Sequence, residues 1–267
     1  MNLAITGSSG NIGGMVARHL NTRGLPLILP LRNPAKATDL PNCEARRFAY
    51  GDLELAKQAL NGVDVLFMVS AAESPLREQE HLTLVQAASE AGVKHIVYLS
   101  FAQAALDNST FTLARTHAVT ENAIRQTNMR YTFLRDNFYS EMMATIANAD
   151  GIIAGPADDG RVACVSQHDV AQSAANIIAD IACDNHHHDN QTYTLTGSQS
   201  LSFAEIAAVL TEITGKPHCY HNETVEEAFA SRKAEYPDTP DWQIEAWVST
   251  YTAIAKGELA TVSDDLS

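Results

Sequence analysis

The stretch MNLAITGSSGNIGG, residues 1–14, decides the fold. Residues 3–6 are apolar and partly β-branched and run directly into glycine, which is typical of a buried parallel strand that enters a tight turn. The apolar residues Ile12, Val16 and Leu20 then recur at the spacing of one helix face. The chain therefore begins with a predicted strand, a glycine turn and a helix.

The turn contains three glycines at intervals of three residues, Gly7, Gly10 and Gly13. Gly7 permits a tight turn, Gly10 lets backbone N–H groups approach a pyrophosphate, and Gly13 lets the helix pack closely on the strand. A helix N-terminus attracts such an anion through its unpaired N–H groups. An ordinary Gly-Ser turn is the alternative, but the position between strand and helix favours dinucleotide binding. The residues predicted to hold the pyrophosphate are Gly7, Ser8, Ser9, Gly10, Asn11, Ile12 and Gly13.

The 267 residues carry a formal net charge of −14, and 45% of them are hydrophobic. This length and composition suit one large globular domain or a domain with a cap. The negative charge argues against nucleic acid or an anionic membrane as a partner, because both need a basic face. No signal peptide precedes the first strand, and no apolar run approaches the ~20 residues that span a bilayer. We therefore expect a cytoplasmic protein that binds a small molecule.

The four cysteines are scattered, without a C-x-x-C pair or a metal-binding spacing, which favours reduced thiols. His186, His187 and His188 form a run within a polar segment. Adjacent residues seldom converge on one metal ion, so a solvated loop is the favoured interpretation. No metal site is predicted.

A second apolar run, residues 25–31, predicts the next strand, and Arg32 follows it directly. At this place in dinucleotide folds an acidic residue binds the 2′-hydroxyl of the adenine ribose, whereas a basic residue accommodates a 2′-phosphate. The chain offers Arg32 and Lys36 and no carboxylate before Asp39. The sequence thus predicts NADP(H) in preference to NAD(H), with a solvated loop charge as the alternative role of Arg32.

Strands predicted at residues 44–50, 63–70 and 94–100 alternate with helices predicted at residues 53–60 and 76–91. This alternation predicts an α/β fold of the Rossmann type, with a doubly wound parallel sheet. Ligands of such sheets bind at the carboxyl ends of the strands. The candidate cofactor-binding residues at these ends are Met68, Val69, Ser70, Ala71 and Ser100.

Four segments carry a family resemblance: TGSSGNIGG at residues 6–14, LRNP at residues 31–34, GDL at residues 51–53 and AGVKHIVYLS at residues 91–100. Together they resemble the short-chain dehydrogenase/reductase superfamily in its atypical NmrA-like branch, which includes reductases of quinones and dyes. The resemblance continues over residues 116–137, 160–171, 193–197 and 202–214. The resemblance implies a Rossmann domain over residues 1–150 and a small, mostly helical C-terminal cap over residues 151–267 that is interwoven with the sheet.

The parent superfamily uses Tyr-x-x-x-Lys on the helix after the fifth strand, with the tyrosine as acid. The matching positions here are Leu113 and His117. Leucine cannot donate a proton, so the resemblance implies hydride transfer without that acid, which suits quinones because their reduced oxygens take protons from solvent. His117 is a candidate for the place of the lysine at the nicotinamide ribose, since histidine can donate or relay a proton. A histidine on a helix surface is the alternative.

The resemblance also implies roles for two pairs of neighbouring residues. Asp52 and Leu53 match positions at the adenine, and Asn137 and Phe138 match positions that pack against the nicotinamide. His117 and Asn137 are therefore the expected catalytic residues, and His117 and Phe138 are expected to contact the cofactor.

Together these features predict an NAD(P)H-dependent reductase of quinone-like acceptors that acts as a monomer or homodimer. A redox sensor that binds NADP(H) without turnover is the second hypothesis, and the leucine in place of the tyrosine supports it. A sugar-nucleotide epimerase is a third, weakened by the same replacement.

Overall fold

The structure, a computed structural model, describes residues 1–102, 104 and 109–266. The chain divides into two compact units. The first unit comprises Met1–Ala104, Thr116–Asp136 and Gln167–Thr194, and the second comprises Ala105–Arg115, Asn137–Ser166 and Leu195–Ser267. Each unit thus collects separate parts of the sequence. The predicted division at residue 150 stays a prediction.

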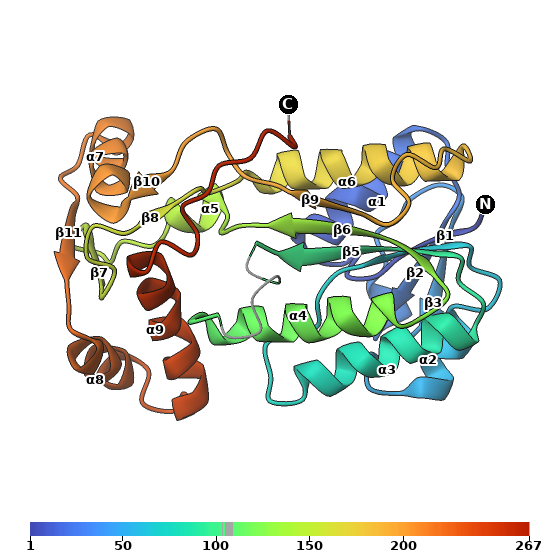
Figure 1. The fold of residues 1–267 in the computed structure, drawn as a ribbon, viewed down its shortest axis with the longest axis horizontal. Coiled ribbons are helices and arrows are strands. Elements are labelled where there is room, and N and C mark those ends of the chain that lie inside the picture. Colours follow the sequence, from blue (N-terminus) through green and yellow to red (C-terminus); the bar gives the residue numbers. More distant parts are fainter. Residues whose placement is uncertain (103, 105–108, 267) are drawn as a thin grey trace. The chain divides into compact units, whose positions relative to one another are not determined.

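The first unit is built on a seven-stranded sheet of the described residues, in the order β3-β2-β1-β4-β5-β6-β9 (Figure 1). Every neighbouring pair in this sheet is parallel. The order reverses at β1, because β2 and β4 lie on either side of it. The strands are β1 (Leu3–Ile5), β2 (Leu27–Leu31), β3 (Cys43–Arg47), β4 (Val65–Met68), β5 (His95–Phe101), β6 (Arg130–Asp136) and β9 (Gln191–Thr194).

Helices cover both faces of this sheet (Figure 1). Helices α1 (Asn11–Thr22) and α6 (Gln167–Ala182) pack together on one face, and α2 (Leu53–Ala59), α3 (Arg77–Glu90) and α4 (Thr112–Arg125) lie on the other. A short 3₁₀-helix, η1 (Pro34–Lys36), follows β2. All residues of β1, β2, β4 and β5 are buried, as expected for parallel strands with helices on both faces. The predicted Rossmann fold is confirmed.

The second unit consists of short strands and helices. One pair of strands, β7 (Ile152–Gly155) and β11 (Cys219–Asn222), is parallel, and the other, β8 (Arg161–Val162) and β10 (Leu201–Ser202), is antiparallel. Its helices are α5 (Ser140–Met143), α7 (Phe203–Thr214), α8 (Val225–Glu235) and α9 (Asp241–Ala255). Capping boxes at Ser202 and Thr224 define where α7 and α8 begin.

Within the described part of the chain, no helix combines the length and the apolar character needed to span a membrane. The described residues likewise contain no group of three or more His, Cys, Asp or Glu side chains placed to hold a metal ion.

Candidate cofactor-binding site

The glycine turn between β1 and α1 has the tight geometry that its sequence predicts. Gly7 has φ +64°, and a Cβ built there would lie 3.1 Å from the Cβ of Val69. A Cβ at Gly13 would lie 2.5 Å from the carbonyl oxygen of Gly7, so the helix packs too closely for any side chain. Among the described residues, a Cβ at Gly10 would meet only that same oxygen, at 3.3 Å. Gly7 and Gly13 are therefore required by the fold, whereas Gly10 leaves open space beside the turn.

The N-terminus of α1 has the features of an anion-binding site. Gly10 is the N-cap, no side chain of the described residues caps the helix, and its first turn contains no acidic residue. The hydroxyl of Ser8 is buried without a hydrogen-bond partner in the described part of the chain. Unpaired backbone N–H groups and an unpartnered hydroxyl at a glycine turn fit a pyrophosphate. Ser9 and Asn11 are exposed at the same turn, whereas the side chain of Ile12 is buried.

The segment that follows β4, residues 69–71, lies beside the glycine turn. Three side chains hold its backbone. The N–H of Val69 donates to Thr6 Oγ1 at 2.8 Å, and the Val69 carbonyl accepts from the Tyr50 hydroxyl at 2.5 Å. The N–H of Ala71 donates to His81 Nε2 at 2.9 Å. Three of the predicted cofactor-binding residues, Val69, Ser70 and Ala71, thus belong to a segment that the protein itself fixes; Met68 is fully buried at the end of β4.

Beneath this segment lies a buried polar cluster that includes His117. Arg77 Nη2 lies 3.0 Å from His117 Nε2, and the Tyr98 hydroxyl lies 2.9 Å from His117 Nδ1. A guanidinium only donates, so Nε2 accepts and Nδ1 carries the proton donated to Tyr98. Burial, together with the charge of Arg77, lowers the pKa of His117 well below its usual value, so the ring is neutral. Both ring nitrogens are engaged within the first unit, and the contact with the ribose stays a prediction.

Ser100 near the end of β5 donates a hydrogen bond to a buried carboxylate. Its hydroxyl lies 2.6 Å from Glu121 Oε1 on α4. Glu121 is fully buried and pairs with Arg135 at 2.6 Å and with Arg125 at 2.9 Å. A buried carboxylate with two guanidinium partners and a hydroxyl donor is well satisfied. Glu121 therefore fixes α4 against β5 and β6, and the hydroxyl of Ser100 is used in that contact.

The residues predicted to bind the adenine half follow β2 and β3. Arg32 comes directly after β2, its side chain is exposed, and the structure gives its guanidinium no hydrogen bond or ion pair with the described residues. The carboxylate of Asp52 accepts from the N–H of Leu55 at 3.0 Å and so caps α2. Leu53, the first residue of α2, is half-buried.

Asn137 and Phe138 belong to the second unit. Asn137 is 2% exposed; its Nδ2 donates to the Leu259 carbonyl at 3.1 Å and its Oδ1 accepts from the N–H of Phe138 at 2.8 Å. The ring of Phe138 packs on Phe111 with 5.4 Å between the centroids. Both polar ends of Asn137 thus order the backbone of its own unit, and its catalytic role stays a prediction.

Three residues of the buried cluster, Arg77, His81 and Tyr98, were not singled out from the sequence. Arg77 and His81 are four residues apart on α3, so they share one helix face, and both are buried. The sequence could have indicated Arg77 and His81, because it places an arginine and a histidine on one face of a helix that follows the end of a strand. Tyr98 lies within the apolar run of β5, and no feature of that run separates it from a core tyrosine.

A glycine turn before an uncapped helix, at the carboxyl edge of a parallel sheet, defines a dinucleotide-binding Rossmann protein. Residues 7–181 match the family described as NAD(P)H-binding, and the chain belongs to that family.

Quinone oxidoreductase 2 of Escherichia coli (strain K12) is 32% identical over 272 residues, which cover 99% of this chain and 92% of that protein. NAD(P)H azoreductase of Xenophilus azovorans is 32% identical over 232 residues, which cover 85% of this chain and 78% of that protein. The crystal structure of the Escherichia coli NADPH-dependent quinone oxidoreductase complexed with NADPH superimposes with a TM-score of 0.89, covering 99% of this chain and 93% of that one. An NmrA-like family domain-containing oxidoreductase of Aspergillus flavus is 24% identical over 232 residues, 81% of this chain and 72% of that protein. The predicted family resemblance is confirmed.

Proposed function

We propose that this chain is an NADPH-dependent reductase that transfers hydride to a quinone-like acceptor. The observation that carries the proposal is the glycine turn with its uncapped helix, in a chain that is similar over 99% of its length to a quinone oxidoreductase. The similarity to an NAD(P)H azoreductase supports the same class of acceptor, a planar conjugated molecule that accepts electrons.

In this proposal the glycine turn and the start of α1 hold the pyrophosphate, and Arg32 binds the 2′-phosphate. Asp52 and Leu53 border the adenine, while residues 68–71 and Ser100 line the middle of the cofactor. The exposed guanidinium of Arg32 supports its assignment, since a charge with no partner among the described residues is available to a phosphate. Bound NADPH supplies the hydride.

His117, Asn137 and Phe138 are proposed to act near the nicotinamide. His117 is neutral and buried, with Nδ1–H directed to Tyr98. It therefore orients its surroundings as a hydrogen-bonded neutral ring rather than as a cation. Leu113, at the place of the superfamily's tyrosine, leaves protonation of the reduced acceptor to solvent.

A second candidate, a sensor that binds NADP(H) without turnover, is favoured by Leu113 alone. A reductase with no proton donor at this position needs an acceptor whose reduced form is protonated by water. A sensor needs no acceptor. We also propose a cytoplasmic protein that acts as a monomer or homodimer; its charge of −14 opposes binding to polyanions.

The test is NADPH oxidation by the purified protein, followed by absorbance, against a panel of benzoquinones, naphthoquinones and azo dyes. We expect at least one acceptor to accelerate NADPH oxidation, and we expect the Gly10→Val variant to lose this rate. A wild-type rate equal to the buffer rate with every acceptor, despite tight NADPH binding, would contradict the reductase and favour the sensor.

A further inference from the structure

The segment after β4 has an unusual support. Three of its backbone groups are bonded to side chains: Val69 N–H to Thr6, Val69 C=O to Tyr50, and Ala71 N–H to His81. Thr6 belongs to the glycine turn, and Tyr50 follows β3. His81 differs from both because it comes from a helix and holds the end of the segment nearest to α3.

His81 can hold Ala71 in only one protonation state. Its Nε2 accepts from the Ala71 N–H, so the ring proton must be on Nδ1. Nδ1 lies 2.9 Å from Thr120 Oγ1, whose own proton is donated to the Thr116 carbonyl at 2.7 Å. Thr120 therefore accepts from His81 and selects the tautomer that leaves Nε2 free for Ala71.

The surroundings keep this ring neutral. His81 is fully buried, and burial together with the nearby charge of Arg77 lowers its pKa to about 3. The Arg77 side chain is 7% exposed and bonds to His117 on the other side of the cluster. The tautomer and the charge of His81 are thus both determined by residues of α3 and α4.

We propose that His81 is a positioning residue of the cofactor site: through the Ala71 N–H it holds residues 69–71 in the conformation that receives the middle of NADPH. This inference rests on the proposed function. It assigns a task to a side chain that does not itself contact the cofactor. Without His81, the Ala71 N–H loses its buried acceptor, and binding must then order a loosened segment, which weakens affinity.

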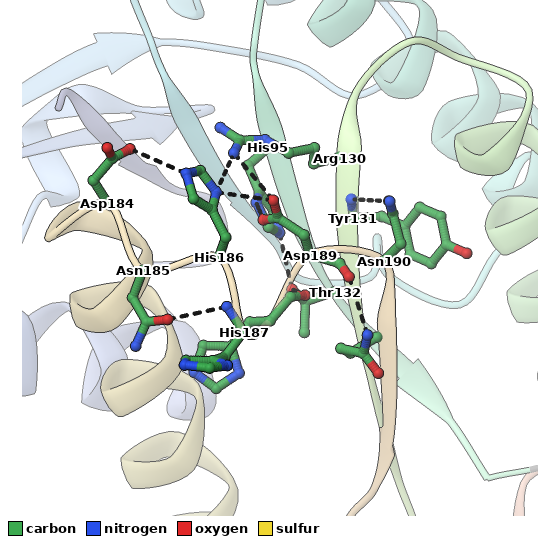
Figure 2. A network of polar contacts seen from close by, with 12 residues as sticks. His95, Arg130, Tyr131, Thr132, Asp184, Asn185, His186, His187, Asp189 and Asn190 are labelled. Atoms are coloured by element: carbon green, nitrogen blue, oxygen red, sulfur yellow. Dashed lines mark hydrogen bonds and ion pairs between the residues drawn. The ribbon is translucent and has the colours of Figure 1, made fainter.

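The first unit contains a matched control, a second buried histidine at the amino end of a strand (Figure 2). His95, at the start of β5, is also fully buried, and its Nε2 lies 2.8 Å from Thr132 Oγ1. Its Nδ1 faces Asp189 at 3.4 Å, in a network with Arg130 and His186. Replacing His95 removes an equally buried histidine and a comparable bond to threonine, away from the carboxyl ends of the strands.

The experiment compares His81→Phe and His81→Gln with His95→Phe and His95→Gln in the full chain. Calorimetry measures the dissociation constants of NADPH and of adenosine 2′,5′-bisphosphate, which carries only the adenine half. Thermal unfolding measures stability. For His81→Phe we expect the Kd of NADPH to rise about tenfold, the effect of one lost buried hydrogen bond, with little change for the bisphosphate. His81→Gln should recover most of the affinity, because its side-chain oxygen can accept from Ala71.

Both His95 variants should lower the unfolding temperature and leave both dissociation constants unchanged. If His81→Phe does not fold, Thr120→Val is compared with Thr132→Val instead. Thr120→Val removes the acceptor of His81 Nδ1–H, so the ring can move its proton to Nε2 and lose the bond to Ala71, whereas Thr132→Val removes the bond to His95 and leaves the contacts of His81 in place. Equal NADPH affinity in wild type and the folded His81→Phe or Thr120→Val protein would overturn the inference. Equal losses in the His95 or Thr132 variants would overturn it as well. A wild-type protein that binds neither ligand would instead refute the proposed function on which the inference rests.

Discussion

Two buried histidines of the first unit, His81 on α3 and His95 at the amino end of β5, make different contacts. His81 and His95 are both fully buried, both bond to a threonine hydroxyl, and burial lowers the pKa of both, to about 3 and about 4. They differ at the second nitrogen, because His95 Nδ1 has no hydrogen-bond partner among the described residues. His81 accepts from a backbone N–H beside the glycine turn, whereas His95 faces the carboxylate of Asp189.

Burial and a shifted pKa therefore do not by themselves identify a functional residue. In a parallel α/β sheet the carboxyl ends of the strands form the binding edge, and the amino ends are closed by loops. His95 contacts the loop between α6 and β9 mainly through Thr132, which bonds to His95 and donates its hydroxyl proton to the carbonyl of His188 in that loop; Asp189 of the same loop lies 3.4 Å from His95 Nδ1. The functional role is proposed for His81 because it lies near the carboxyl ends of the strands and accepts a hydrogen bond from the backbone N–H of Ala71.

The largest effect is expected at the glycine turn. Gly10→Val places a branched side chain where the pyrophosphate must lie, so we expect NADPH affinity to fall by about 100-fold or more, which is ~2.7 kcal/mol. The fold should survive, because among the described residues a Cβ at Gly10 meets only the Gly7 carbonyl, at 3.3 Å. Calorimetry and thermal unfolding measure the two effects. Gly13→Ala is the contrasting variant, since its Cβ would lie 2.5 Å from that carbonyl and should destabilise the fold itself. Unchanged affinity in a folded Gly10→Val protein would refute the site.

Replacing Arg32 tests whether the site distinguishes NADPH from NADH. Arg32→Ala should weaken NADPH by roughly 1.5–3 kcal/mol, the value of a charged hydrogen bond, and leave NADH nearly unchanged. Lys94→Ala is the control, because Lys94 lies at the amino ends of the strands, just before β5, and pairs with Asp64 at 2.7 Å. Competition binding with both nucleotides gives the comparison. Equal losses for NADPH and NADH would mean that Arg32 does not contact the 2′-phosphate.

We expect His81 and His95 to make the free energy of unfolding decrease as the pH falls. The folded pKa of His81 and of His95 lies below the unfolded value of 6.5, so the unfolded chain binds protons more tightly. Their contribution is complete above about pH 6.5 and decreases as the pH falls towards 4, by up to ~1.4 kcal/mol per pH unit for each ring. Between pH 7 and pH 5 we expect a loss of roughly 2 kcal/mol per histidine. Denaturant unfolding of wild type and of both Gln variants measures it. Variants with the wild-type pH dependence would contradict this account.

The smallest effect is expected for His117. His117→Ala removes the acceptor of Arg77 and the donor of Tyr98, so we expect kcat to fall about tenfold while NADPH affinity changes little, because orientation limits transfer more than binding. Steady-state kinetics and calorimetry on the same preparation separate the two quantities. A variant with the wild-type kcat would remove His117 from the proposed site and leave the reductase intact.

The sequence predicts the features that depend on local pattern. The strand, glycine turn and helix of residues 1–22 follow from spacing, and the alternation of strands and helices predicts the parallel sheet. Gly7 is predicted to permit a tight turn and Gly13 to let the helix pack closely, and the positive φ of Gly7 and the 2.5 Å approach at Gly13 agree with these roles. These inferences succeed because a glycine turn and a periodic apolar face are determined by neighbouring residues.

The polar clusters depend on contacts between distant segments, and local pattern does not reveal them. Arg77 and His117 are 40 residues apart, and His81 and Thr120 are 39 apart. His117 was predicted from its place in a motif, but its two bonding partners lie on α3 and β5. The sequence of residues 186–188 predicts a solvated loop, and nothing in it indicates that the neighbouring Asp189 lies 3.4 Å from His95.

The most direct test of the difference between the carboxyl and amino ends of the strands is hydrogen–deuterium exchange with and without saturating NADPH. We expect slower exchange in peptides that contain residues 6–14 and 69–73, and no change in peptides that contain residues 93–96 and 185–190. Protection at the glycine turn and at residue 71 together would support the binding edge as described. NADPH-dependent protection around His95 and Asp189, or none at the glycine turn and the segment after β4, would contradict it.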